Sequence, residues 1–275
     1  MKTQINQSKA IVQHLKDFCL SGIRDSFEEL SKKAHSEDLS YEEYLLELLD
    51  RESEVRFNKR IERRLKESRL ALEKNMDSFD LKLIPRKALQ QTKSLLEGDF
   101  LDRSENVLAF GNPGSGKTHL LSAICQELIR KGRRIYAMPC SLLVQDLLLA
   151  KQNLKLASFF KKLRHFDALL IDDVGYVQHD RAEIEVLFTL LAERYEKGSI
   201  MITSNLPFSK WDRIFKDPMT TAAAIDRLVH HSIILELNIP SYRMNQAKAK
   251  GLKAGHDSEK NAHAANYQNE ALAAK

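Results

Sequence analysis

Apolar residues three or four positions apart run through the N-terminal part of the chain and predict helices. Two short amphipathic helices are indicated, with Ile11, Leu15 and Phe18 on the first and Ile23, Phe27 and Leu30 on the second. Ser40 and Glu43 have the spacing of a capping box, which predicts a further helix from about Tyr41 to about Lys74. We therefore expect a small all-helical domain over residues 1–78.

The pattern changes at Asn75–Pro85, where the helical periodicity breaks and apolar runs begin to alternate with helical stretches. Five runs have the composition of buried strands: Asn106–Gly111, Arg134–Cys140, Ala168–Asp173, Ser199–Asn205 and Ser232–Asn238. The stretches between them are long enough for crossover helices, so an α/β fold with a parallel five-stranded sheet is predicted over residues 79–243. Residues 244–275 are small and polar, and a disordered tail is expected there.

Composition limits the possible classes of protein without choosing one. Hydrophobic residues make up 43% of the chain, which suffices for one sizeable core and a smaller appendage. No apolar run approaches the length of a membrane span, and the N-terminus lacks the hydrophobic region of a signal peptide. Cys19, Cys125 and Cys140 are widely spaced and indicate neither a disulfide framework nor a zinc site. We expect a cytoplasmic protein that has no contact with membranes.

Basic residues are concentrated in one predicted helix. The formal net charge is +5, and the stretch Arg51–Lys74 holds nine Lys/Arg against five Asp/Glu. Five of these side chains are candidates for contact with DNA phosphates: Arg56, Lys59, Arg60, Arg63 and Arg64. A solvated helix with ion pairs between successive turns explains the same residues equally well.

The segment GNPGSGKTHL combines three glycines with a lysine just before a helical run. Gly111, Gly116, Lys117 and Thr118 meet the spacing G-x-x-x-x-G-K-[ST] of a Walker A P-loop, which cradles phosphates with backbone N–H groups. Lys117 is expected to reach the β- and γ-phosphate oxygens, and Thr118 to ligate Mg²⁺. The predicted nucleotide-binding residues are Gly111, Asn112, Pro113, Gly114, Ser115, Gly116, Lys117, Thr118 and His119.

A second phosphate-site motif is ALLIDDVG, an apolar strand that ends in two aspartates. Ligands of parallel sheets bind at the carboxyl ends of the strands, which is where these carboxylates lie. Asp172 is predicted to hold Mg²⁺, and Asp173 to orient the attacking water, a role that usually falls to glutamate. Beside a P-loop this interpretation is stronger than the alternative of a helix N-cap pair.

Two further side chains are candidates for the hydrolytic machinery. Asn205 ends the apolar strand in SIMITSNLPFSKW and is placed to sense the γ-phosphate, although an asparagine before a proline turn is also ordinary loop chemistry. Arg227 precedes the last strand, and arginine is suited to stabilising phosphoryl oxygens in its own or a neighbouring subunit. An ion pair with Asp226 or Glu236 is its simpler role.

These motifs together resemble the AAA+ ATPases of the IstB and DnaC type. The order of GNPGSGKTHL, ALLIDDVGY and SIMITSNLPFSKW, followed by IDRLVHH and IPSYR, looks most like the IstB family. The resemblance implies an ATP- and Mg²⁺-dependent ATPase that binds double-stranded DNA, assembles into a homo-oligomer and directs an IstA-type transposase. It also implies that Asp172 and Asp173 are the Walker B pair, Asn205 sensor 1 and Arg227 an arginine finger. Arg243 is a candidate sensor 2.

Other functions use the same motifs. A DnaC-type helicase loader shares the ATPase signature, and the difference is expected in the N-terminal domain, where the basic cluster favours DNA as the partner. A small-molecule kinase also uses a P-loop, but the sequence offers no evident acceptor site, and the two aspartates followed by a strand-end asparagine favour hydrolysis of ATP.

Overall fold

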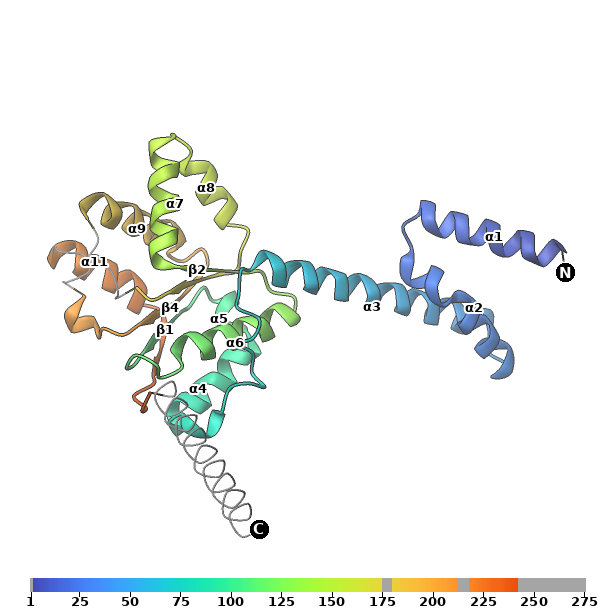
Figure 1. Cartoon of the computed structure of the whole chain (residues 1–275), viewed down its shortest axis with the longest axis horizontal. Coiled ribbons are helices and arrows are strands. Elements are labelled where there is room, and N and C mark those ends of the chain that lie inside the picture. Colours follow the sequence, from blue (N-terminus) through green and yellow to red (C-terminus); the bar gives the residue numbers. More distant parts are fainter. Residues whose placement is uncertain (1, 175–179, 212–217, 242–275) are drawn as a thin grey trace, which may run out of the picture. The chain divides into compact units, whose positions relative to one another are not determined.

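The computed structural model describes residues 2–174, 180–211 and 218–241, and the side chains of residues 2–6 and 218–221 are left out of the description. It divides into two compact units, residues 1–67 and residues 68–275. Figure 1 shows the elements of both units. The predicted tail at 244–275 and Arg243 lie outside the described residues.

The first unit is all-helical and contains α1 (Lys2–Asp17), α2 (Ser21–Ser36) and α3 (Tyr41–Glu67). Its small core consists of Ile23 and Leu30 of α2 and Leu48 of α3. The predicted capping box is present, since Glu43 N donates to Ser40 Oγ and Ser40 N donates to the Glu43 carboxylate. The expected helical N-terminal region is therefore confirmed.

A buried carboxylate joins α3 to the start of α2. Glu52 accepts hydrogen bonds from the backbone N–H groups of Gly22, at 2.6 Å, and Ile23, at 3.2 Å, and from Arg56 Nε at 2.7 Å. Burial raises the pKa of Glu52, but the bonds from Arg56 and the two amides outweigh it and hold the pKa below its usual range. The two helices approach so closely that a Cβ at Gly22 would lie 2.8 Å from Glu52 Cα.

The third helix ends earlier than the sequence pattern indicates. The pattern extends it to about Lys74 and places the domain boundary at residue 78, whereas α3 ends at Glu67 and the second unit begins at Ser68. The backbone of Arg69 has a positive φ of 59°, which breaks the helix, and Ala137 N donates to Ser68 O. The chain after Glu67 thus belongs to the unit that contains the sheet.

The second unit has a parallel five-stranded sheet in the order β2-β3-β4-β1-β5. The strands are β1 (Asn106–Phe110), β2 (Ile135–Pro139), β3 (Ala168–Asp172), β4 (Ser199–Ser204) and β5 (Ser232–Glu236). The five predicted strands are confirmed, each one or two residues longer in the sequence pattern than in the sheet. The fold class, an α/β P-loop fold with a helical N-terminal region, is as expected.

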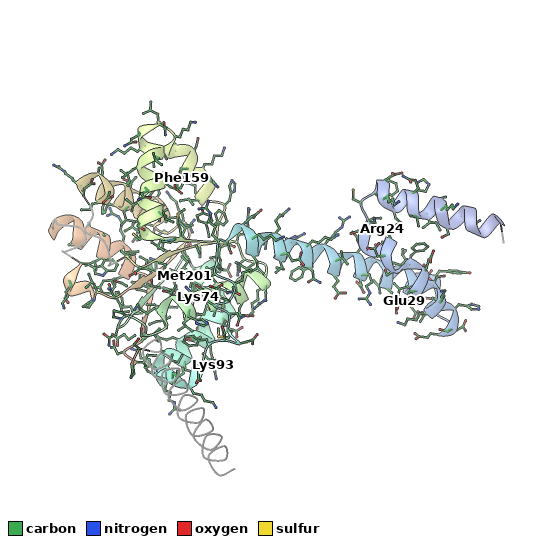
Figure 2. All side chains as sticks on the ribbon, in the orientation of Figure 1. Arg24, Glu29, Lys74, Lys93, Phe159 and Met201 are labelled. Atoms are coloured by element: carbon green, nitrogen blue, oxygen red, sulfur yellow. The ribbon has the colours of Figure 1, made fainter. Side chains whose placement is uncertain are left out.

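Helices cover both faces of the sheet (Figure 1). The described helices and 3₁₀ turns are η1 (Leu81–Leu83), α4 (Arg86–Glu97), α5 (Asp99–Asp102), α6 (Lys117–Arg130), α7 (Cys140–Gln152), α8 (Leu156–Leu163), α9 (Arg181–Arg194), η2 (Phe208–Lys210) and α11 (Pro218–Val229). Helices α4 and α6 lie on one face, and α7, α9 and α11 on the other. Met201 of β4 is fully buried in the interior of this unit (Figure 2).

The strand order determines where chemistry is possible. β1 lies between β4 and β5, and β3 lies beside β4, so the carboxyl ends of β1, β3 and β4 meet at one edge of the sheet. The P-loop follows β1, the two aspartates end β3, and Asn205 follows β4. Among the described residues no helix is both long and apolar enough to cross a membrane.

Candidate functional site

The loop between β1 and α6 has the backbone of a phosphate cradle. Gly114 and Gly116 have φ values of +80° and +87°, in the left-handed region that favours glycine. A Cβ at Gly116 would lie 2.9 Å from Phe79 Cε2, so a side chain there would need the aromatic ring to move. The hydroxyl of Ser115 is buried and has no hydrogen-bond partner among the described residues. The loop therefore presents backbone and a small polar group to a ligand.

Lys117 is the first residue of α6 and is 8% exposed. Its ammonium donates to Gly111 O at 2.8 Å and to Asn112 O at 3.0 Å, which places the charge across the mouth of the loop. The start of α6 adds the positive end of a helix dipole at the same point. The site thus combines a cation, a helix N-terminus and a glycine-rich backbone, which together suit a polyphosphate.

Asp172 joins the two predicted phosphate motifs. Thr118 Oγ1 donates to Asp172 Oδ1 at 2.8 Å, so the residue after the P-loop lysine contacts the last residue of β3. A hydroxyl and a carboxylate side by side are the oxygen donors that Mg²⁺ prefers, and the P-loop supplies the phosphates that share its coordination. The residues present therefore fit Mg²⁺.

The hydroxyl of Thr203 on β4 holds the end of β3 from the other side. Thr203 Oγ1 donates to Asp172 Oδ1 at 2.5 Å and accepts a hydrogen bond from Asp173 N at 2.8 Å. Asp173 has a positive φ of 64°, which is uncommon for a residue with a side chain. Asn205 lies just beyond β4, and its Oδ1 is buried with no partner among the described residues. The predicted residues Asp172, Asp173 and Asn205 thus lie at the carboxyl ends of two adjacent strands.

A cavity of about 400 Å³ extends from the loop and is lined by Lys117, Thr118, Phe79 and Ile239, among others. Part of its wall comes from the segment 73–80. The neighbouring backbone contacts α6, since Gln126 Nε2 donates to Ala71 O and Lys74 O. His119 Nε2 lies 3.0 Å from Ser78 Oγ and 3.1 Å from Asn75 O. The cavity has room for more than phosphates, with apolar groups next to the charged end.

Comparison with known proteins agrees with this geometry. The family model described as IstB-like ATP binding protein matches residues 13–250. This chain belongs to the IstB-like ATP-binding protein family. It is 41% identical over 234 residues to an insertion-sequence ATP-binding protein of Sinorhizobium fredii, covering 85% of this chain and 78% of that protein. It is 36% identical over 228 residues to the IS21 ATP-binding protein of Pseudomonas aeruginosa, covering 82% of this chain and 85% of that protein. The resemblance inferred from the motifs is confirmed.

Solved structures of other proteins show the same fold. The DnaC helicase loader superposes with a TM-score of 0.52 at 20% identity, covering 61% of this chain and 97% of that one. DnaA from Aquifex aeolicus, bound to AMPPCP, gives 0.53 at 21% identity, covering 66% of this chain and 55% of DnaA. At this identity the likeness concerns the fold alone. The IstB-like chain therefore shares the P-loop fold of these two proteins.

Arg227 lies on α11 of the IstB-like fold. Its guanidinium carbon is 4.6 Å from the centre of the Phe188 ring on α9, and its Nη1 donates to Ala223 O at 3.3 Å. Neither Asp226 nor Glu236 forms an ion pair with Arg227 among the described residues. The surface ion pair that the sequence suggests as the simpler role of Arg227 is therefore not formed in the described part of the chain.

The five basic residues of α3 differ in whether they form hydrogen bonds or ion pairs within the helical unit. Arg56 pairs with Glu52, Lys59 Nζ donates to Ser21 Oγ at 2.8 Å, and Arg63 lies 3.7 Å from Glu67. Arg60 is exposed and forms no ion pair among the described residues, whereas Arg64 is half-buried. The cluster therefore combines bonds that stabilise the helical unit with charge that faces solvent.

Several residues of the candidate site carry no motif and are not predicted from the sequence. Thr203 was not singled out, although a threonine in the apolar strand IMITS is a polar residue at a buried position, which is a usable signal. Phe79, Ser78 and Ile239 also contribute to the site. They come from segments that carry no motif, and only the folded chain brings them to the P-loop.

Proposed function

We propose that this chain is an ATP-dependent, DNA-binding AAA+ ATPase that assembles on duplex DNA and helps a transposase to select its target during insertion-sequence transposition. The observation that supports it best is the contact of Thr118 with Asp172 beside the P-loop, in a chain whose relatives at 36–41% identity are insertion-sequence ATP-binding proteins. The contact suits MgATP, and the relatives suggest the process in which the ATPase works.

The chain's own residues divide the work of hydrolysis. Backbone groups from Gly111 to Gly116 and the ammonium of Lys117 bind and orient the phosphates. Thr118 and Asp172 would hold Mg²⁺, which would supply positive charge near the phosphate oxygens. Asp173 orients a water molecule, and Asn205 directs its amide toward the same region. An arginine finger, Arg227, completes the site from a neighbouring subunit.

DNA binding is the second part of the proposal. Exposed arginines on α3 supply charge for phosphates, and no zinc-binding group of three or more His, Cys, Asp or Glu occurs in the described part of the chain. Phosphate contacts are therefore expected to dominate, with weak dependence on sequence and a strong dependence on salt. An IstA-type transposase is proposed as the partner, because the relatives at 36–41% identity are insertion-sequence proteins.

The function is tested by measuring phosphate release from ATP with purified protein, with and without duplex DNA, and DNA binding with and without ATP. We expect release of phosphate without any acceptor molecule, stimulation by duplex DNA, and tighter DNA binding with ATP. Transfer of phosphate to a small molecule would favour a kinase instead. Binding to a replicative helicase, with no effect on transposase activity at target DNA, would favour a helicase loader.

A further inference from the structure

We propose that Thr203 is a positioning residue for ATP hydrolysis, which holds the carboxylate of Asp172 and the backbone of Asp173 in their working arrangement. This inference rests on the proposed ATPase function and assigns a task to a residue outside the two phosphate motifs. Thr203 is 1% exposed and is the next-to-last residue of β4. Its hydroxyl is thus inaccessible to solvent and has only protein groups to bind.

The hydroxyl uses both of its hydrogen-bonding capacities at the end of β3. It donates to Asp172 Oδ1 at 2.5 Å, and it accepts from Asp173 N at 2.8 Å. The backbone carbonyl of Thr203 also accepts from Val174 N at 3.1 Å. One residue of β4 therefore binds three successive residues just where the sheet ladder ends.

This contact stabilises a backbone conformation of Asp173 that is energetically unfavourable. Asp173 has a φ of 64°, and the left-handed region disfavours residues with a Cβ. The bond from Asp173 N to Thr203 Oγ1 fixes the peptide that leads into this conformation, and the direction of the Asp173 side chain follows from the backbone. Without the hydroxyl, the N–H of Asp173 loses this hydrogen bond, and the left-handed conformation of Asp173 becomes less stable.

The contact also restricts Asp172. Its Oδ1 accepts from Thr118 on one side and from Thr203 on the other. Two donors on one oxygen fix the plane of the carboxylate beside the Thr118 hydroxyl, where Mg²⁺ is expected. Groups that orient a ligand in this way typically change metal affinity or activity by about 10–100-fold when they are removed.

A buried threonine elsewhere in the same unit shows the contrast. Thr92 of α4 is also 1% exposed, and its hydroxyl donates to Ala88 O of its own helix at 2.8 Å. That bond satisfies the hydroxyl locally and contacts no residue of the site. Thr92→Val therefore makes the same chemical change at an equally buried position, and it serves as the matched control.

The experiment compares Thr203→Val, which keeps the shape and removes the hydroxyl, with Thr203→Ser, which keeps the hydroxyl, and with Thr92→Val. We expect Thr203→Val to lower kcat by about 10–100-fold with little change in KM for ATP. The Mg²⁺ concentration that gives half-maximal binding of a fluorescent ATP analogue should rise, while affinity without Mg²⁺ should match the parent. Thr203→Ser should recover most of both properties, and Thr92→Val should behave as the parent does. Thermal unfolding of each variant monitors folding, and Thr203→Ala replaces Thr203→Val if the valine variant does not fold.

A double mutant separates this inference from the function on which it rests. In an Asp173→Asn background, adding Thr203→Val should cost much less than it does alone, because both changes act on the same step. Parent-like hydrolysis by Asp173→Asn would contradict the proposed role of Asp173. Two results would overturn only the role of Thr203. One is slow hydrolysis by Asp173→Asn while Thr203→Val keeps the parent's kcat and Mg²⁺ dependence. The other is a Thr203→Ser variant that hydrolyses ATP as slowly as Thr203→Val.

Discussion

Lys117 is the first residue of α6, and its charge beside the P-loop backbone suits the phosphates of a nucleotide. We expect Lys117→Ala to weaken ATP binding by about 1.5–3 kcal/mol or more, because a charge-assisted contact with phosphate is lost. A titration with a fluorescent ATP analogue measures the change.

Lys131→Ala is a matched control for this variant. Lys131 follows the other end of α6 and also donates to a backbone carbonyl, Leu96 O, at 2.7 Å. It should bind the analogue as the parent does. Equal affinity of Lys117→Ala and the parent would mean that the nucleotide binds elsewhere.

Glu52 provides a pH-dependent test of the helical unit. Glu52→Gln removes a buried charge that three donors satisfy, and we expect a loss of about 1.5–3 kcal/mol in the free energy of unfolding of this unit. The pKa of Glu52 is lowered in the folded state, so its contribution is present above the ordinary pKa of glutamate, about 4.3, and is lost as the pH falls through the lowered value.

The measurement is denaturant unfolding followed by circular dichroism, at pH 7 and in steps below about pH 4.3. The difference between the parent and Glu52→Gln should shrink as the pH falls. Glu62→Gln changes an exposed glutamate of the same helix and should have little effect at either pH. A difference that stays constant down to the acid transition would show that the charge of Glu52 is not what stabilises the unit.

At the scale of elements, periodicity predicted the helices and strands well because each has a face that must be buried. The predicted end of α3 near Lys74 is wrong because the residues after Glu67 continue a helical pattern, whereas in the structure Arg69 has a positive φ and Ser68 O accepts a bond from β2. The same holds for the site. Motif spacing identified Lys117 and Asp172. Phe79 lines the cavity from a segment that carries no motif, so its position can be known only from the folded unit.

Helix α3 carries the prediction about DNA. Neutralising Arg56, Lys59, Arg60, Arg63 and Arg64 to glutamine should weaken duplex binding and reduce its dependence on salt. Arg56 and Lys59 also hold Glu52 and Ser21, so the full variant risks destabilising the unit. Arg60→Gln avoids this, because Arg60 is exposed and without an ion pair among the described residues.

Fluorescence anisotropy with labelled duplex over a range of salt concentrations measures both quantities. For the single variant we expect a salt slope smaller by about one, whereas Lys32→Gln, an exposed lysine of α2, should leave the slope unchanged. If even the five-fold variant, shown to be folded, keeps the parent's affinity and slope, α3 is only a solvated helix face.

At the scale of the whole molecule, the question is whether one chain holds a complete catalytic site. Arg227 packs on Phe188 of α9, and its described contacts are with α9 and its own helix rather than with the P-loop. We expect it to act on the nucleotide of a neighbouring subunit, so that the assembly hydrolyses ATP and the free monomer is nearly inactive. Arginine fingers contribute roughly 10³–10⁵ in rate where they have been dissected.

Arg227→Ala should therefore bind ATP almost normally and hydrolyse it poorly, while the specific activity of the parent rises with protein concentration or on DNA. Arg130→Ala, at the far end of α6, serves as a control and should keep the parent's activity. Mixing Arg227→Ala with Lys117→Ala gives the sharper test, since some interfaces then combine an intact P-loop with an intact arginine. Activity of the mixture above that of either variant supports action between subunits. If mixtures that demonstrably co-assemble recover no ATPase activity, Arg227 either acts within its own subunit or has no part in catalysis.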